Sequence, residues 1–269
     1  MQKQKPIIEV KNLTKKFKSL TAVDNISFDV KQGEIFGFLG PNGAGKTTTI
    51  RMLTTMLSPT SGEMLINNFN PVKQKHQTRQ SFGIVFQDQS LDNELTAKEN
   101  MEFHAALYSV PKAERKARIE SLLKLVGLLE RKDDFVKNFS GGMKRRLEIA
   151  RGFLHHPKIL FLDEPTLGLD PQTRNQLWKY VKSVNKKEKM TIFLTTHYMD
   201  EAEKVAKRIV IIDHGKIIKI GSPSQLKNST KSPSLEKAFL KLTGHTIREE
   251  SSSAKDRMRA VQKSWGREM

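Results

Sequence analysis

The stretch Gly40-Pro41-Asn42-Gly43-Ala44-Gly45-Lys46-Thr47 decides the fold of this chain. It follows a short apolar segment, Glu34–Leu39, that suits a buried strand, and it opens a helical segment, Lys46–Leu57. Its glycines let backbone N–H groups converge on phosphates at the positive end of that helix. Lys46 is placed to reach the β and γ phosphates, and the Thr47 hydroxyl suits Mg²⁺. The pattern therefore predicts a P-loop in an α/β domain that binds a nucleotide.

The length and composition limit the class of protein. The 269 residues are enough for one large α/β domain plus a tail. No apolar run approaches the roughly 18 residues of a membrane span, and Met1–Pro6 lacks the apolar core of a secretory signal. We therefore expect any membrane role to come through a partner. The absence of cysteine excludes disulfides, thiolate catalysis and cysteine-type zinc sites.

The net charge of +18, from 47 basic and 29 acidic residues, allows three interpretations. They are nucleic-acid binding, attraction to an anionic membrane leaflet, and a solvated basic surface. The basic residues are spread along the chain, with a denser stretch at Lys112–Arg118. Only 7% of the residues are aromatic, and no arginine-rich run is interleaved with them. We therefore expect no nucleic-acid partner.

The order of expected elements divides the chain. Residues 7–10 and 24–30 suit antiparallel strands, because Ile26, Phe28 and Val30 alternate with polar residues. After a strand at Ser81–Phe86 the pattern turns helical, and the α/β pattern resumes at Ile159. We predict a mixed sheet with N-terminal antiparallel strands and an inserted α-helical subdomain at about 89–156. The predicted domain covers residues 1–228, followed over 229–269 by a short helix and a basic, flexible tail.

Two acidic residues follow an apolar strand, and they are candidates for metal binding and catalysis. Asp163 ends the segment Ile159–Asp163, and in a parallel sheet its carboxylate would lie beside the P-loop, where it can hold Mg²⁺. Glu164 comes next and is placed to orient or deprotonate an attacking water. The alternatives are a strand-end aspartate that caps a turn and a glutamate on the surface.

Two more polar residues follow predicted strands. Gln87 follows the strand that ends at Phe86, and its neutral amide near the metal would sense the γ phosphate. His197 follows the strand Thr191–Thr195 and is placed to donate a hydrogen bond to the same phosphate. The alternatives are an exposed loop glutamine and a histidine that caps a helix.

Ser140-Gly141-Gly142 marks a second anion site. Ser140 is a good N-cap, and the two glycines leave backbone N–H groups bare beside a positive helix end. The alternative is a helix start with no further role. Two phosphate cradles in one chain require either two ligands or two copies that face each other.

Together these motifs, in this order over about residues 7–228, resemble the ATP-binding cassette (ABC) ATPases. The resemblance implies a P-loop NTPase core, with ATP and Mg²⁺ as cofactors. It implies the Walker A loop at Gly40–Thr47 with Thr48, the Q-loop at Gln87, the signature at Ser140-Gly141-Gly142, Walker B at Ile159–Asp163, the catalytic base Glu164, the D-loop at Asp170 and the switch histidine at His197. It also places Phe17 under the adenine, where the family usually has tyrosine.

The signature departs slightly from the family's Leu-Ser-Gly-Gly-Gln, because Phe139 precedes it and Met143 follows it. The stretches Gly141–Leu147, Phe86–Asp92 and Pro233–Phe239 resemble the daunorubicin-type drug-export branch. This branch implies an ATPase subunit that serves a separate ABC-2 type membrane permease. From the two cradles we expect a homodimer or a paired ATPase subunit, whose segment Gln87–Leu107 passes movement to the permease. Since ATP and the missing signal favour the cytoplasm, we expect a cytoplasmic subunit, peripheral on the inner face of the membrane.

Other functions fit the sequence less well. A chromosome-maintenance ATPase needs a long coiled coil between Lys46 and Asp163, and no sustained heptads lie there. A translation-type protein usually carries two cassettes. A GTPase needs a guanine reader, which Asn185-Lys186-Lys187-Glu188 imitates poorly, and a pure binding module would lack Glu164. A soluble non-transport ATPase acting on nucleic acid or the ribosome remains the alternative. The transported substrate stays open.

Overall fold

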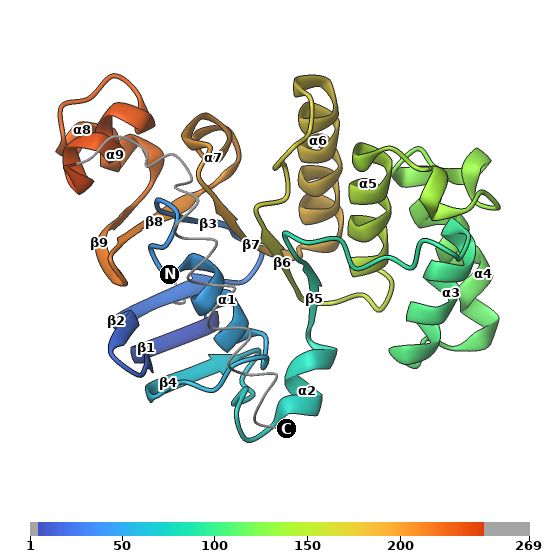
Figure 1. Ribbon diagram of the computed structural model, residues 1–269, viewed down its shortest axis with the longest axis horizontal. Coiled ribbons are helices and arrows are strands. Elements are labelled where there is room, and N and C mark those ends of the chain that lie inside the picture. Colours follow the sequence, from blue (N-terminus) through green and yellow to red (C-terminus); the bar gives the residue numbers. More distant parts are fainter. Residues whose placement is uncertain (1–4, 245–269) are drawn as a thin grey trace.

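The computed structural model describes residues 5–244, which form two sheets with helices around them (Figure 1). The smaller sheet is antiparallel, in the order β2-β1-β4. Its strands are β1 (Pro6–Phe17), β2 (Leu20–Lys31) and β4 (Ser61–Ile66). The larger sheet has the order β5-β6-β7-β3-β8-β9. Its strands are β3 (Ile35–Leu39), β5 (Phe82–Val85), β6 (Ile159–Asp163), β7 (Thr191–Thr196), β8 (Arg208–Asp213) and β9 (Lys216–Gly221).

The larger sheet is mixed, as expected. Its first five strands in sheet order, β5, β6, β7, β3 and β8, are parallel, and β9 runs antiparallel to β8. The register pairs Leu39 with Thr196, and Asp163 with Thr195. The carboxyl ends of β3, β6 and β7 therefore lie level and side by side, which is where ligands bind in sheets of this kind.

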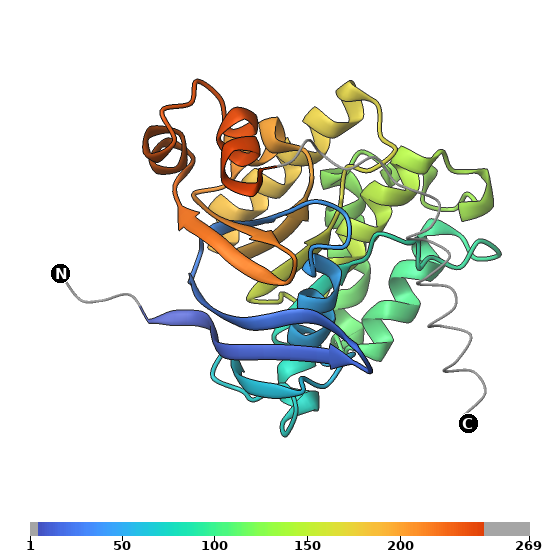
Figure 2. The ribbon, with the colours of Figure 1, turned by 60° about the vertical axis from the view of Figure 1, so that its left-hand side comes forward.

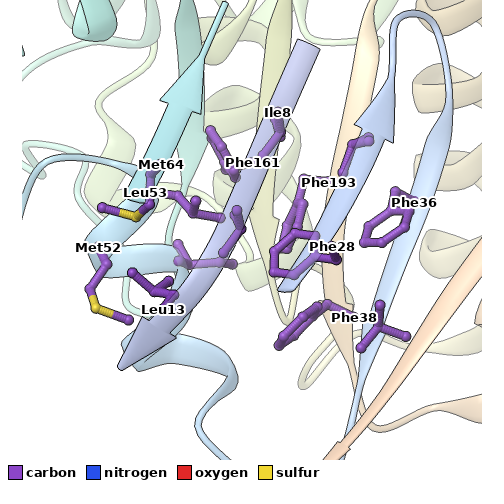
Figure 3. Packing of buried hydrophobic residues seen from close by; sticks show 14 of the residues in the cluster. Ile8, Leu13, Phe28, Phe36, Phe38, Met52, Leu53, Met64, Phe161 and Phe193 are labelled. Carbon is purple, nitrogen blue, oxygen red and sulfur yellow. The ribbon is translucent and has the colours of Figure 1, made fainter. Parts of the chain in front are cut away.

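A core of aromatic rings joins the two sheets (Figure 3). Phe28 of β2 lies against Phe36 and Phe38 of β3 and Phe193 of β7, with ring centroids 5.4–6.1 Å apart. Ile50, Met52 and Leu53 of α1 (Lys46–Leu53) belong to the same cluster. Large buried rings dominate core energetics, so this cluster fixes β3 and α1, the two elements that flank the P-loop.

Helices cover the other face of the larger sheet. α6 (Pro171–Glu188) places Leu177, Trp178 and Val181 against alternate residues of β6 and β7. The alternation is that of a strand buried on both faces, with phenylalanines toward the antiparallel sheet and leucines toward α6. Figure 2 shows the blue antiparallel strands along one side of the molecule.

The stretch between β5 and β6 is helical, which confirms the predicted insertion. It contains α3 (Ala97–Leu107), α4 (Lys112–Leu125), two short 3₁₀ helices (Leu129–Arg131 and Val136–Asn138) and α5 (Gly141–Gly152). These helices have a core of their own that includes Met101, Leu123 and Leu147. Thr96 caps α3 with both halves of a capping box.

The C-terminal helices belong to the same folded unit. α7 (Met199–Val205), α8 (Pro223–Ser229) and α9 (Leu235–Thr243) share one cluster with β3 and β8, in which Leu226 and Phe239 are buried. A boundary at residue 228 falls inside α8. We therefore propose that the folded unit extends to Gly244. The tail predicted beyond Gly244 lies outside the described residues.

Some elements differ from the sequence-based expectation. α1 ends at Leu53 rather than Leu57, and β1 and β2 are longer than predicted. Strand β4, the short helix α2 (Lys75–Gln80) and α8 were not predicted. Among residues 5–244, no helix has the length and apolar character needed to cross a bilayer.

Candidate functional site

The P-loop joins the end of β3 to the start of α1. Gly45 has φ 103°, and a Cβ there would lie 2.5 Å from the Ala22 carbonyl oxygen, so the position requires glycine. The amides of Lys46, Thr47 and Thr48 open α1, and the first N–H groups of a helix have no intrahelical acceptor. The loop thus presents free N–H groups at a positive helix end.

The rest of the loop has a buried floor and an exposed tip. Gly40, Pro41 and Ala44 are buried, whereas Asn42 and Gly43 are exposed. A Cβ at Gly40 would lie 2.3 Å from the Ile212 carbonyl oxygen, so β8 leaves no room for a side chain. The floor of the loop is therefore held tightly against the sheet.

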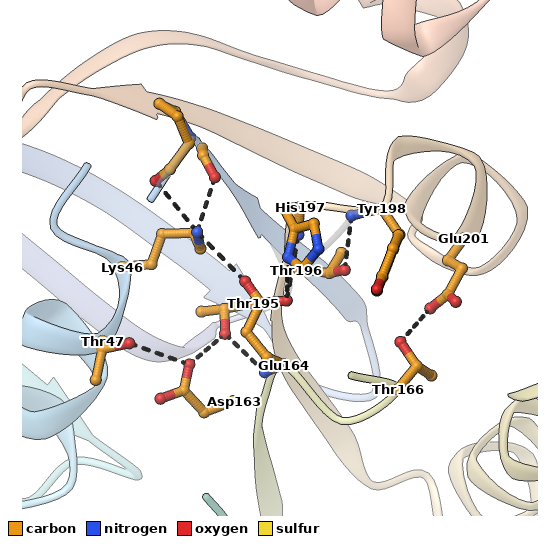
Figure 4. Close-up of polar contacts among 12 residues, drawn as sticks. Lys46, Thr47, Asp163, Glu164, Thr166, Thr195, Thr196, His197, Tyr198 and Glu201 are labelled. Carbon is orange, nitrogen blue, oxygen red and sulfur yellow. Dashed lines mark hydrogen bonds and ion pairs between the residues drawn. The ribbon is translucent and has the colours of Figure 1, made fainter. Parts of the chain in front are cut away.

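Lys46 is buried and points into this loop (Figure 4). Its Nζ donates to the carbonyl oxygens of Gly40 at 2.8 Å and Pro41 at 3.3 Å. It also lies 3.3 Å from Oε1 of Glu164, in an ion pair whose side chains are both 6% exposed. A buried ammonium needs such partners, because its desolvation is costly.

Asp163 ends β6 beside the first turn of α1. Its Oδ1 accepts hydrogen bonds from the hydroxyls of Thr195 at 2.5 Å and Thr47 at 3.5 Å. Burial raises the pKa of Asp163, and the Thr195 hydrogen bond opposes that shift. The structure therefore brings Thr47 and Asp163 together, as the sequence predicted.

Glu164 lies next to Asp163 with a left-handed backbone, φ 47°. Its Oε2 is 2.9 Å from Nδ1 of His197. Burial acts to raise the pKa of Glu164, but the His197 hydrogen bond and the Lys46 charge outweigh burial and lower that pKa. Glu164, Lys46 and His197 thus form one contact group, as Figure 4 shows.

Ser140 caps α5, and its Oγ accepts from the Met143 amide at 3.2 Å. Ser140 and Gly141 are exposed. Among the described residues, no hydrogen bond or ion pair joins residues 140–142 to residues 40–47. One chain therefore presents the two predicted phosphate cradles separately.

Asp170 is an exposed N-cap of α6, and it accepts from the Thr173 amide at 2.9 Å. The starts of α5 and α6 lie close together, because a Cβ on Gly142 would be 2.9 Å from Cγ2 of Thr173. The predicted signature and D-loop are therefore neighbours on the surface.

The structure does not test the predicted roles of Gln87 and Phe17. Gln87 is exposed just beyond β5, the strand next to β6, and no hydrogen bond of its side chain is seen in the part of the chain described. Phe17 ends β1 opposite Leu20, and Nζ of Lys15 lies 5.0 Å from its ring centroid. The metal contact of Gln87 and the adenine contact of Phe17 stay predictions.

Comparison with known proteins assigns this arrangement to a family. The sequence profile of the ABC transporter family matches residues 23–167. The chain belongs to the ABC transporter family. It is 42% identical over 220 residues to the linearmycin resistance ATP-binding protein LnrL of Bacillus subtilis (strain 168). The aligned region covers 82% of this chain and 70% of the relative. It is 40% identical to the daunorubicin/doxorubicin resistance ATP-binding protein DrrA of Streptomyces peucetius, over 82% of this chain and 67% of the relative.

Solved ABC structures have the same fold. An ATP-binding subunit of an ABC transporter superposes with a TM-score of 0.81 at 29% identity, over 88% of this chain and 99% of that chain. The dimeric ATP-binding cassette MJ0796, bound to ADP and Pi, superposes with a TM-score of 0.73 at 28% identity, over 80% and 98% of the two chains. The chain is thus the ATP-hydrolysing subunit of an ABC transporter, and the non-transport alternative is not supported.

Two buried charged residues of this ABC ATPase were not predicted from the sequence to take part in the site. Arg145 of α5 donates to the carbonyl oxygens of Asp163 and Glu164. Glu201 of α7 accepts from the Thr166 hydroxyl at 2.7 Å and from Nε1 of Trp178 at 3.0 Å, and so links the segment after Glu164 to α6. Arg145 lies within the stretch Gly141–Leu147, but no role was predicted for it, and Glu201 lies in none of the predicted motifs. Both residues meet these partners only through the fold.

Proposed function

We propose that two copies of the chain bind two ATP molecules between them, each held by the P-loop of one copy and by Ser140-Gly141-Gly142 of the other. The observation that supports this is the separation of the two cradles: the exposed start of α5 does not contact the P-loop of its own chain. ATP that contacts both copies stabilises the closed dimer by mass action. Phe17 would pack against the adenine.

Mg²⁺ fits the pair formed by Thr47 and Asp163 at the end of β6. Within residues 5–244 no cluster of three or more His, Cys, Asp or Glu residues could hold a metal. Thr47 and Asp163 offer a hydroxyl and a carboxylate to the same point, and Gln87 would add an amide oxygen. Mg²⁺ is commonly held by one or two carboxylates together with substrate phosphates and water. When bound, the ion would neutralise charge on the phosphates.

Glu164 is proposed as the general base, and His197 as the residue that orients it and contacts the γ phosphate. The lowered pKa keeps the Glu164 carboxylate ionised at neutral pH, so it accepts a proton from water. Among residues 5–244, Oε1 has no hydrogen-bond partner, and it lies 3.3 Å from the Lys46 ammonium. This oxygen is therefore the one available to a water molecule once phosphate draws Lys46 away.

Mixing two inactive variants tests the shared site. Lys46→Ala removes the lysine of one cradle, and Ser140→Arg blocks the other cradle. A mixed dimer contains one site built from the intact P-loop of one copy and the intact signature of the other. With independent sites, an equal mixture is expected to recover about a quarter of the wild-type ATPase rate, because half of the dimers are mixed.

The control replaces Ser140→Arg with Glu164→Gln. Each site takes both its Lys46 and its Glu164 from the same copy. No pairing of Lys46→Ala with Glu164→Gln therefore builds an intact site. This mixture is expected to stay inactive. A Lys46→Ala and Ser140→Arg mixture that only sums the two separate rates would contradict a shared site.

We further propose that the subunit serves an ABC-2 type permease that exports a drug-like or lipid-like substrate, and that it docks on the inner face of the cell membrane. The relatives named for linearmycin and daunorubicin resistance support export. Phe103 and Leu107 lie one turn apart on α3 and are 69% and 68% exposed. Such a pair suits a protein contact, and we propose that it contacts the permease.

Phe103→Glu tests this contact. We expect the ATPase rate of the isolated subunit to stay within about twofold of the wild type, because α3 lies outside the nucleotide site. Co-purification with the proposed ABC-2 type permease from solubilised membranes should fall about tenfold or more. Leu20→Glu is the matched control, since Leu20 is 63% exposed on the antiparallel sheet. Equal recovery of both variants would contradict the proposed contact.

A further inference from the structure

Arg145 is a charged side chain buried in the first half of α5, only 5% exposed. It lies on the helix that begins at the signature, five positions after Ser140. A guanidinium carries five N–H donors and keeps its charge at all ordinary pH values. Its burial therefore requires several acceptors arranged around a rigid plane.

Three of those acceptors are consecutive carbonyl groups at the end of β6. Arg145 donates to the carbonyl oxygens of Asp163 at 3.1 Å, Glu164 at 3.0 Å and Pro165 at 2.8 Å. These bonds fix the peptide groups on both sides of Glu164. That matters because a non-glycine residue at φ 47° is strained by roughly 1–2 kcal/mol and needs surrounding contacts to keep that conformation.

The same guanidinium reaches the segment that contains Gln87. Its Nη1 donates to the Phe86 carbonyl oxygen and, at 3.1 Å, to Oε2 of Glu148. Oε1 of Glu148 in turn accepts from the Ser90 amide at 2.7 Å. The residues on either side of Gln87-Asp88-Gln89 are thus tied to the pair formed by Arg145 and Glu148, whose side chains are 7% and 1% exposed.

We propose that Arg145 is a positioning residue for ATP hydrolysis, which holds the base Glu164 and the Gln87 segment at fixed places relative to the helix that carries Ser140. The inference rests on the proposed roles of Glu164 and Ser140. Arg145 does not contact the P-loop, so it acts on the rate of the chemical step through the backbone of Glu164 and not on the binding of ATP.

Lysine cannot replace this arginine, because a single ammonium lacks the planar fork that meets several carbonyl groups at once. Arg145→Lys keeps the charge beside Glu148 but loses the fork. Arg146→Lys is the matched control: Arg146 is the next residue on α5, and its Nη1 donates to the Val126 carbonyl oxygen inside the helical subdomain.

The experiment measures kcat, the KM for ATP and the thermal midpoint of the full-length protein. Arg145→Lys is expected to lower kcat about 10- to 100-fold with the KM for ATP within about threefold of the wild type. Arg146→Lys should change kcat less than about twofold. The double variant Arg145→Gln/Glu148→Gln removes both buried charges together, which avoids an unpaired charge and preserves folding. It should show the same loss of kcat.

Wild-type kcat in either folded Arg145 variant would overturn the proposal. A loss of kcat no larger than the loss of folded protein, or a parallel rise in KM, would also overturn it, since both indicate a merely structural role. Glu164→Gln measured beside them separates the two hypotheses. If Glu164→Gln keeps turnover, the proposed function fails, whereas an inactive Glu164→Gln beside an active Arg145→Lys rejects the role of Arg145 alone.

Discussion

At the scale of single residues, the site depends on one strained position. Glu164 keeps its left-handed backbone because its amide donates to the Thr195 carbonyl oxygen at 3.1 Å and its carbonyl accepts from Arg145. Strain of this kind persists only where the surroundings hold it, and it concentrates at functional sites. The neighbours of Glu164 thus place its carboxylate between Lys46 and His197.

Glu164→Gln tests the role of that carboxylate. The amide has nearly the same shape and leaves the P-loop intact, so we expect ATP binding to persist. Turnover should fall by about 10²–10⁴-fold with the loss of the base, and a closed dimer should accumulate with ATP. Phosphate release and size-exclusion chromatography measure the two effects. Asp200→Asn, an exposed carboxylate on α7, is the control. An undiminished rate would reject Glu164 as the base.

The sequence predicted a contact of the site where the residues concerned stand at the end of a strand or at the start of a helix. Asp163 and Thr47 meet because each terminates or begins a regular element at the same edge of the sheet. Arg145 and Glu201 were not predictable in this way. Apart from Glu148, which lies three positions after Arg145, their partners lie 18 or more residues away in the chain, and only the packing of α5 and α7 brings them close.

At the scale of elements, aromatic side chains join α3 to the end of α5. The rings of Tyr108 and His155 stack with centroids 4.0 Å apart, and His104 lies 4.6 Å from Tyr108. His155 also contacts the Phe82 carbonyl oxygen of β5 at 2.9 Å. Burial, with smaller effects from Arg151 and His155, lowers the pKa of His104 to about 3. The inserted helices are therefore attached to the sheet through His155, and the neutral His104 lies behind it against Tyr108.

This attachment predicts a pH dependence of stability. Between pH 6.5 and about 3, His104 is protonated in the unfolded chain but neutral in the folded chain. The free energy of unfolding therefore falls as the pH falls. From pH 7 to 5 the loss is on the order of 1–2 kcal/mol. Thermal midpoints at the two pH values measure it. His104→Gln should show a smaller decrease than the wild type, and the exposed His156→Gln should match the wild type. An equal decrease in His104→Gln would contradict this account.

The elements that were missed are held by distant partners rather than by their own pattern. Strand β4 exposes Ser61, Gly62 and Glu63, so it shows little apolar alternation. It forms because β1 pairs with it, and Gly62 at φ 96° approaches the Asn12 carbonyl so closely that a Cβ would lie 2.4 Å away. The helix α2 has six residues and buries only Thr78. Neither element carries a periodic signal long enough to predict.

At the scale of the whole molecule, the layers explain why the fold was the most predictable feature. The buried strands are short, apolar and bounded by turn residues, and the P-loop fixes which of them lies in the centre. The division into a core and inserted helices follows from the change in periodicity after Phe86. The packing of α9 against α7 and α8 was not visible in the sequence, because Phe239 is buried by residues outside its own helix.

The ion pair between Lys46 and Glu164 has a consequence for the order of events at the site. While it lasts, the cation suppresses the proton affinity of the carboxylate. A nucleotide that draws the ammonium onto its phosphates separates that cation from the carboxylate, and this change increases the basicity of Glu164. The substrate itself thereby converts a weak proton acceptor into a stronger one, at the moment when a water molecule has to be deprotonated.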